Sequence, residues 1–189
     1  MDRTQQNTNQ QYDQIIEKCK NIFINKTTDY GTAWRVLRNI SITDQIYIKA
    51  QRIRTIQEKK QQKIEEDISG EFIGIVNYAV IGLIQMDLTE ETPEELSVEE
   101  VNRWYDKKVN VARELMQEKN HDYGEAWRGM SQQSFTDLIL MKLQRMRQII
   151  NNEGRTIMSE GLDANYTDII NYAVFALILD SEKNNPQYS

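Results

Sequence analysis

This chain contains the same unit twice. The segment Asp29-Tyr30-Gly31-Thr32-Ala33-Trp34-Arg35 recurs 93 residues later as Asp122-Tyr123-Gly124-Glu125-Ala126-Trp127-Arg128. At the same spacing, identical residues pair Ser41, Thr43, Asp44, Ile46, Lys49, Gln51, Arg52 and Arg54 with Ser134, Thr136, Asp137, Ile139, Lys142, Gln144, Arg145 and Arg147. After one inserted residue, Asn77-Tyr78-Ala79-Val80 recurs as Asn171-Tyr172-Ala173-Val174. The chain is therefore a tandem duplication, and each copy should have the same fold.

Each copy is expected to form three helices. Apolar residues recur every three or four positions in the first helix of each copy, and the third helix is apolar on nearly all sides. The expected first and third helices are 12–26 and 71–86 in one copy, and 98–119 and 165–179 in the other. Between them, a glycine in the motif ends the first helix, and the second helix begins near Thr43-Asp44 and Thr136-Asp137. These patterns predict an all-α fold, in which the two three-helix units pack as a helical bundle about an approximate twofold axis.

The predicted organisation has five parts. They are a flexible N-terminus (1–11), the first repeat (12–88), an acidic linker around Pro93 (89–97), the second repeat (98–181) and a flexible C-terminus (182–189). Ser97 followed by Glu99 and Glu100 is a plausible capped start of the first helix in the second repeat.

Composition narrows the class of protein. The net charge of −6 argues against nonspecific binding to nucleic acid, which depends on clustered Lys and Arg. Cys19 is the single cysteine, so an internal disulfide is excluded, and its place in an amphipathic stretch favours packing over nucleophilic chemistry. The N-terminus has no apolar signal segment, and the longest apolar run, Phe72–Met86, is shorter than the about 20 residues that span a bilayer. We therefore expect a cytoplasmic protein without a membrane partner, which could form a homodimer.

Carboxylates in the second copy could hold a metal ion. Glu114, Glu118 and Asp122 are spaced four residues apart and share one helix face, and Asp168 precedes Asn171 by three residues on the third helix. Hard divalent cations such as Mg²⁺ prefer oxygen ligands of this kind. The alternative is a solvated helix face with ordinary ion pairs.

The first copy lacks most of these acids. The residues aligned with Glu114, Glu118 and Asp168 are Asn21, Asn25 and Gly74, although Glu71 could place a carboxylate one turn before Gly74. This asymmetry predicts a working site that belongs mainly to the second copy.

Basic and aromatic residues could complete the site. Lys142 and Arg145, like Lys49 and Arg52, are neighbours on the second helix and could hold phosphate oxygens or fix the motif aspartate. Tyr123 and Trp127 could stack on a base or anchor the core. His121, the single histidine, is weak evidence for any chemistry.

The motif segment and the third helix of the second copy resemble a known family. Lys119-Asn120-His121-Asp122-Tyr123-Gly124-Glu125-Ala126-Trp127-Arg128, followed by Asp168-Ile169-Ile170-Asn171-Tyr172-Ala173, is similar to the nucleotide modification associated domain of type 1, and the resemblance covers both copies. The layout also looks similar to all-α nucleotide pyrophosphatases of the MazG and dimeric dUTPase type.

This second resemblance implies a mechanism. Glu114, Glu118, Asp122 and Asp168 would hold Mg²⁺, with Glu118, Asp122 and Asp168 also serving in catalysis of nucleotide hydrolysis. The substrate would be bound by Lys142, Arg145, Tyr123, Trp127, Arg128 and Asn171, with Asn171 recognising a base or sugar edge. The rival hypothesis is a non-catalytic module that binds a nucleotide or a protein.

Overall fold

The computed structural model describes residues 3–59, 68–156 and 160–184, and every regular element in them is helical. The first copy consists of α1 (Arg3–Tyr30), the short 3-10 helix η1 (Ala33–Val36), α2 (Asn39–Lys59) and α3 (Ile68–Asp87). The second copy repeats this order with α4 (Val98–Tyr123), η2 (Ala126–Gly129), α5 (Gln132–Asn151) and α6 (Leu162–Asn184). The predicted all-α class with three long helices per copy is confirmed.

The N-terminal boundary differs from the prediction. Helix α1 begins at Arg3, within the segment 1–11 that we expected to be flexible. Thr8 is fully buried and accepts a hydrogen bond from Arg128 at 2.6 Å, and Gln11 donates to Glu182 at 2.8 Å. These long-range contacts hold a polar segment that has no apolar periodicity of its own. At the other end, α6 extends past the predicted boundary to Asn184, and residues 185–189 lie outside the described part.

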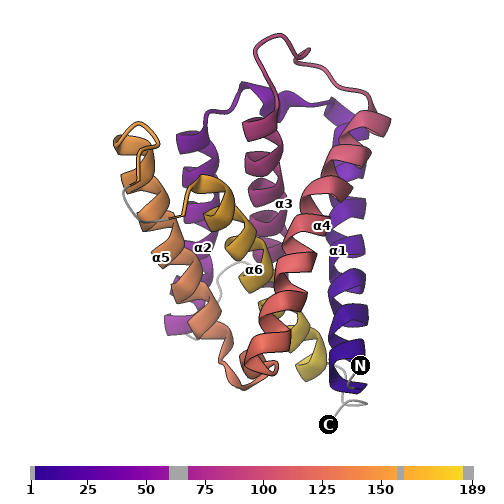
Figure 1. Cartoon of the computed structure of the whole chain (residues 1–189), viewed down its shortest axis with the longest axis vertical. Coiled ribbons are helices and arrows are strands. Elements are labelled where there is room, and N and C mark those ends of the chain that lie inside the picture. Colours follow the sequence, from indigo (N-terminus) through magenta and orange to yellow (C-terminus); the bar gives the residue numbers. More distant parts are fainter. Residues whose placement is uncertain (1–2, 60–67, 157–159, 185–189) are drawn as a thin grey trace.

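The two copies pack about an approximate twofold axis, with their equivalent helices antiparallel. In Figure 1, α1 and α4 lie side by side in opposite directions, so the two motif turns are at opposite ends of the bundle. Arg113 of α4 binds Asp13 of α1 at 2.6 Å, and the aligned pair, Lys20 and Asp106, forms an ion pair of the same length with the helices exchanged. Helices α2 and α5 are joined by a similar pair of equivalent ion pairs, one between Arg147 and Asp44 and the other between Arg54 and Asp137.

Helices α3 and α6 form the centre of the core and share the most extensive contact in the molecule. Their apolar residues are almost all buried, as predicted for the third helix of each copy. Gly82 allows this approach, because a Cβ atom there would lie 2.4 Å from the ring of Tyr166. Among the described helices, α3 alone is long and apolar enough to cross a membrane. However, 67% of its 18-residue apolar stretch is buried inside the protein, as in a core helix.

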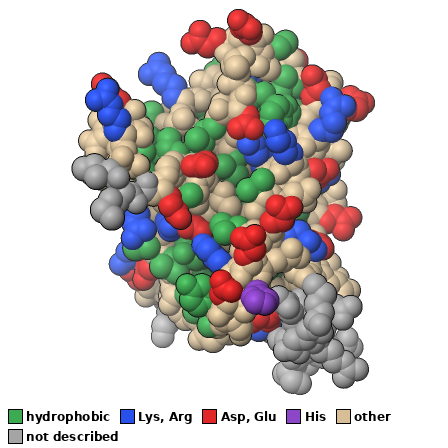
Figure 2. Space-filling model, in the orientation of Figure 1, with side chains coloured by type: hydrophobic (Ala, Val, Ile, Leu, Met, Phe, Trp, Pro, Cys, Tyr) green, Lys and Arg blue, Asp and Glu red, His purple; other side chains and the backbone are tan. Residues whose placement is uncertain are grey.

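The linker and the helix starts follow local rules. Ser97 and Glu100 form a capping box that starts α4, which confirms the predicted cap. The linker is fixed to the first motif turn, since the Thr32 hydroxyl donates to the Glu94 carbonyl at 2.6 Å and accepts from the Leu96 amide. Figure 2 shows acidic and basic side chains interspersed on one face of the molecule, without a continuous basic area.

Candidate functional site

Each motif forms a tight turn between a long helix and a 3-10 helix. Gly31 and Gly124 have left-handed backbones, with φ of 66° and 60°, and so end α1 and α4 as predicted. The motif tyrosines project into solvent, with Tyr30 61% and Tyr123 74% exposed. The tryptophans turn inward: Trp127 is buried, whereas Trp34 is only partly buried. Of the two roles that the sequence left open for Trp127, the burial of its ring favours the core anchor.

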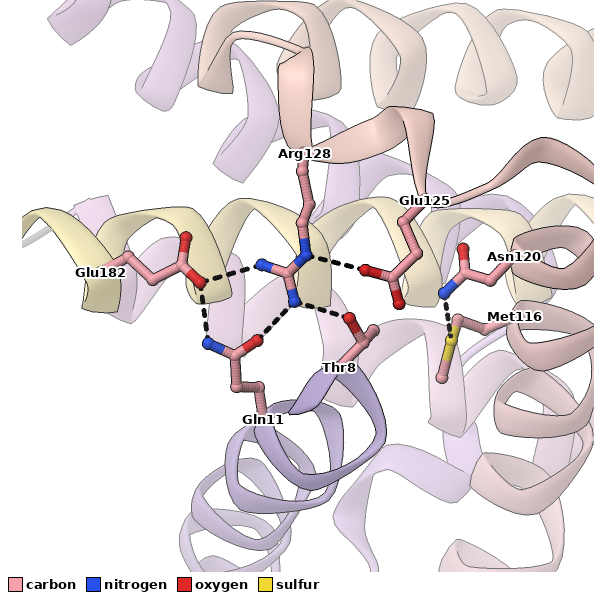
Figure 3. Close-up of polar contacts among 7 residues, drawn as sticks. All are labelled: Thr8, Gln11, Met116, Asn120, Glu125, Arg128 and Glu182. Atoms are coloured by element: carbon pink, nitrogen blue, oxygen red, sulfur yellow. Dashed lines mark hydrogen bonds and ion pairs between the residues drawn. The ribbon is translucent and has the colours of Figure 1, made fainter. Parts of the chain in front are cut away.

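The motif arginine is part of the scaffold. Figure 3 shows the Arg128 guanidinium bonded to four side chains, three of which come from the ends of the chain. It donates to Glu125 at 2.9 Å, to Glu182 at 2.9 Å, to Thr8 at 2.6 Å and to Gln11 at 2.7 Å. Since each of its three nitrogens donates to another side chain, Arg128 supports the fold in this structure, and its role in substrate binding stays a prediction. The aligned Arg35 similarly binds Gln85 and the carbonyl of Thr92.

The third-helix asparagines join the two copies. The amide of Asn171 accepts from the Tyr12 hydroxyl at 2.8 Å and donates to the Ala112 carbonyl at 3.0 Å. Asn77 has the equivalent contacts with Tyr105 and with the carbonyl of Cys19. Both amides are buried and their partners lie inside the protein, so these asparagines join the copies in this structure, and recognition of a base or sugar by Asn171 stays a prediction.

The predicted metal ligands do not converge. Glu114 and Glu118 are exposed on α4, and the 73% exposed Asp122 side chain lies 3.2 Å from its neighbour His121. The carboxylate of Asp168 is buried and turned toward lysines instead. Within the described residues, no three His, Cys, Asp or Glu side chains form a group that could hold a metal ion. The four-carboxylate metal site is therefore contradicted, and Mg²⁺ stays a prediction without an assembled site.

Two lysines clamp Asp168. Lys119 donates to Oδ1 at 2.8 Å, and Lys142 donates to Oδ2 at 2.6 Å. Burial alone would raise the pKa of Asp168, but the hydrogen bonds and charges of the two lysines outweigh burial and lower this pKa. Burial likewise disfavours the charged form of Lys119, yet the hydrogen bond and charge of Asp168 raise its pKa. Lys142 thus pairs with Asp168 and not with Asp122, which the sequence had left open.

The first copy has a looser version of this cluster. Gly74 replaces Asp168, and Glu71, one turn earlier, accepts from Lys49 at 3.3 Å and from Arg52 at 2.6 Å. The Lys49 side chain is 27% exposed, compared with 9% for its counterpart Lys142. Lys26, the counterpart of Lys119, is exposed and has no ion pair among the residues that the structure describes.

Both copies have a pocket behind the motif turn, lined by equivalent residues. The pocket in the second copy has a volume of about 120 Å³, and that in the first about 600 Å³. Ten residues of the smaller pocket align one by one with residues of the larger. They are Met116, Lys119, Asn120, Tyr123, Ala126, Trp127, Asp168, Asn171, Tyr172 and Phe175, which align with Phe23, Lys26, Thr27, Tyr30, Ala33, Trp34, Gly74, Asn77, Tyr78 and Ile81.

Two third-helix substitutions account for the difference in volume. In the second copy, the ring of Phe175 stacks on Trp127 with centroids 4.2 Å apart and planes 7° from parallel, and Asp168 fills the space between the lysines. In the first copy these positions are Ile81 and Gly74, so no third-helix ring stacks on Trp34 and no carboxylate at position 74 lies between Lys26 and Lys49. Only the larger volume lies within the about 300–1,000 Å³ usual for small-molecule sites.

The open pocket lies in the first copy, whereas the predicted site residues belong to the second. Tyr123, Trp127 and Lys142 line or border the closed pocket, and Arg145 is exposed on α5. The residues that sequence reasoning missed are Lys26, Tyr78 and the glycine at position 74. The comparison of the two repeats contained the signal, because Gly74 aligns with Asp168. The glycine was interpreted only as the loss of a carboxylate, although a smaller residue can also enlarge a pocket.

Comparison with known families assigns both copies to one domain. The model of nucleotide modification associated domain 1 matches residues 26–86 and again residues 119–179. These segments contain the pocket residues of each copy from the first lysine onward. Comparisons with the curated proteins and with the solved structures find no match.

Proposed function

Because the chain belongs to the nucleotide modification associated domain 1 family, we propose that it is a nucleotide-binding protein whose ligand occupies the first copy. The observation that carries this proposal is the 600 Å³ pocket between α1, η1, α2 and α3, which combines aromatic rings with two lysines. Ligand pockets are typically concave and largely apolar, with a few polar groups that fix orientation.

The apolar part of this pocket suits a nucleobase. Tyr30, Trp34 and Tyr78 line it together with aliphatic side chains of α1 and α3. The Tyr30 ring lines the pocket and is exposed, so a base can stack on it. Stacking of a base on an aromatic side chain is worth about 1–3 kcal/mol and is tolerant of base identity.

The polar part suits a phosphate. Lys26 and Lys49 both line the pocket, and Lys49 has a long 3.3 Å contact to Glu71 and lies 5.9 Å from the centre of the Tyr78 ring. Glu71 keeps the shorter contact with Arg52, so Lys49 can turn to a ligand without leaving that carboxylate unpaired. This arrangement favours binding over the predicted Mg²⁺-assisted hydrolysis, for which the described residues supply no grouped carboxylates.

The test is a binding screen on the full chain. We expect 5′-nucleotides to raise the thermal midpoint, because a ligand that binds only the folded state stabilises it. Calorimetry with the 5′-monophosphates and triphosphates of adenosine, guanosine, cytidine and thymidine then measures affinity. A phosphate-release assay on the same panel shows whether any nucleotide is hydrolysed.

Matched variants locate the ligand. Tyr30→Ala should weaken binding about 5- to 150-fold, the equivalent of one stacking contact. Tyr123→Ala removes the equivalent exposed ring at the closed pocket and should leave the affinity unchanged. Lys26→Gln should weaken binding, whereas Lys18→Gln, an exposed lysine earlier on α1 that is outside the pocket, should not. If no nucleotide binds, or if Tyr123→Ala alone weakens binding, the proposal is wrong.

A further inference from the structure

The second copy fills its own pocket with two side chains of α6. The Phe175 ring lies flat on Trp127, and the Asp168 carboxylate lies between Lys119 and Lys142. A planar ring on an indole and an anion between two ammonium groups are the two contacts that a nucleotide would need. In the first copy, the indole and both lysines are retained, whereas Ile81 and Gly74 replace the ring and the carboxylate, and Glu71 reaches Lys49 from one turn earlier at 3.3 Å.

We propose that these two side chains mark the ligand's position: the Asp168 carboxylate corresponds to a phosphate monoester held by Lys26 and Lys49, and the Phe175 ring corresponds to the base on Trp34. This inference rests on the proposed function and adds the class of ligand, a nucleoside monophosphate. It also predicts one ligand per chain, because the second pocket is occupied from within.

Charge supports a monophosphate over a triphosphate. A phosphate monoester carries about −1.5 to −2 charges near neutral pH, which two lysines can balance. A triphosphate would bring further negative charge near Glu71 and Glu95, whose carboxylate lies against Gly31 at the pocket wall. No group of carboxylates in the described residues could hold a cation to offset that charge.

The place of Lys49 over Gly74 supports the same position for the anion. A Cβ atom at Gly74 would lie 2.8 Å from Cε of Lys49, so the Lys49 side chain lies directly over the glycine. An aspartate introduced at this position would therefore meet Lys49 as Asp168 meets Lys142. The neighbour that must move is the flexible end of a lysine side chain, so we expect the fold to tolerate the substitution.

The decisive experiment compares Gly74→Asp with Gly74→Asn by titration calorimetry, using the four 5′-monophosphates and their parent nucleosides. Both side chains occupy the same volume, but only aspartate neutralises the lysines. We expect Gly74→Asp to weaken monophosphate binding at least 10-fold more than Gly74→Asn does, whereas the two variants should bind the nucleosides equally. In the wild-type protein, each monophosphate should bind at least 10-fold more tightly than its nucleoside and at least as tightly as its triphosphate.

The reverse exchange tests the second pocket. Asp168→Gly combined with Phe175→Ile gives the second copy the side chains of the first, and the stoichiometry should rise from one monophosphate per chain to two. If wild-type protein binds monophosphates but Gly74→Asp and Gly74→Asn weaken them equally, this inference is overturned and the proposed function stands. If wild-type protein binds no nucleotide at all, the proposed function itself fails.

Discussion

The second copy has a buried aspartate, Asp168, where the first has Gly74. This carboxylate is the counter-ion of Lys119 and Lys142. Removing its charge by Asp168→Asn leaves Lys142, whose side chain is 9% exposed, without a counter-ion. Breaking a buried ion pair in this way costs about 3–5 kcal/mol of unfolding free energy. The matched control is Glu118→Gln, since an exposed glutamate should change stability by less than about 0.5 kcal/mol. Urea denaturation measures the free energy of unfolding of the two variants. Equal stabilities would contradict a stabilising role for the ion pairs of Asp168 with Lys119 and Lys142.

The pH dependence of the stability difference between wild type and Asp168→Asn tests whether the charge of Asp168 causes it. Because the pKa of Asp168 is lower in the folded state, its contribution is fully present above the unfolded value of about 3.9. That contribution is lost as the pH falls below 3.9 through the folded pKa, since the unfolded state then binds more protons. The stability gap between wild type and Asp168→Asn should therefore narrow on acidification from about pH 5. A gap that stays constant would mean that the substitution acts through packing.

At the scale of helices, two reciprocal hydrogen bonds join the copies. Tyr12 of α1 donates to Asn171 of α6, and Tyr105 of α4 donates to Asn77 of α3. Burial raises the pKa of both tyrosines, so each hydroxyl keeps its proton and donates at neutral pH.

Loss of either hydroxyl should destabilise the protein to a similar extent. Tyr12→Phe and Tyr105→Phe each leave a buried amide oxygen without its donor, which costs about 1–3 kcal/mol. Tyr123→Phe removes a hydroxyl from an exposed ring and should have little effect. The measurement is the free energy of unfolding by guanidinium. A much larger loss from one of the buried tyrosines would show that the two contacts are not equivalent.

The sequence predicted the helices better than the contacts between them. The 93-residue repeat, the turn glycines and the apolar third helices were enough for the fold class, because each is a local or periodic feature. The start of α1 at Arg3 was missed, since Thr8 and Gln11 are ordered by Arg128, a residue far away in the sequence. Among the described residues the predicted metal ligands do not form a group, for a similar reason: the spacing of Glu114 and Glu118 shows a shared face, but it does not show whether that face meets another carboxylate or solvent.

For the whole molecule, the pseudo-twofold arrangement implies that neither copy is a complete folding unit. The most extensive contact, between α3 and α6, joins one copy to the other, as do the ion pairs between α1 and α4. We therefore expect fragments 1–91 and 92–189 to be largely unfolded, or self-associated, when each is prepared alone. A small unit buries too little apolar surface to offset its loss of conformational entropy, and a partner copy supplies the remaining surface. Mixing the fragments should restore helical circular dichroism and give a one-to-one complex in analytical ultracentrifugation, with a thermal midpoint that rises with concentration. A fragment that is monomeric, fully helical and cooperatively folded on its own would instead make each copy an independent domain, and the reciprocal contacts would then be a docking interface between two finished folds.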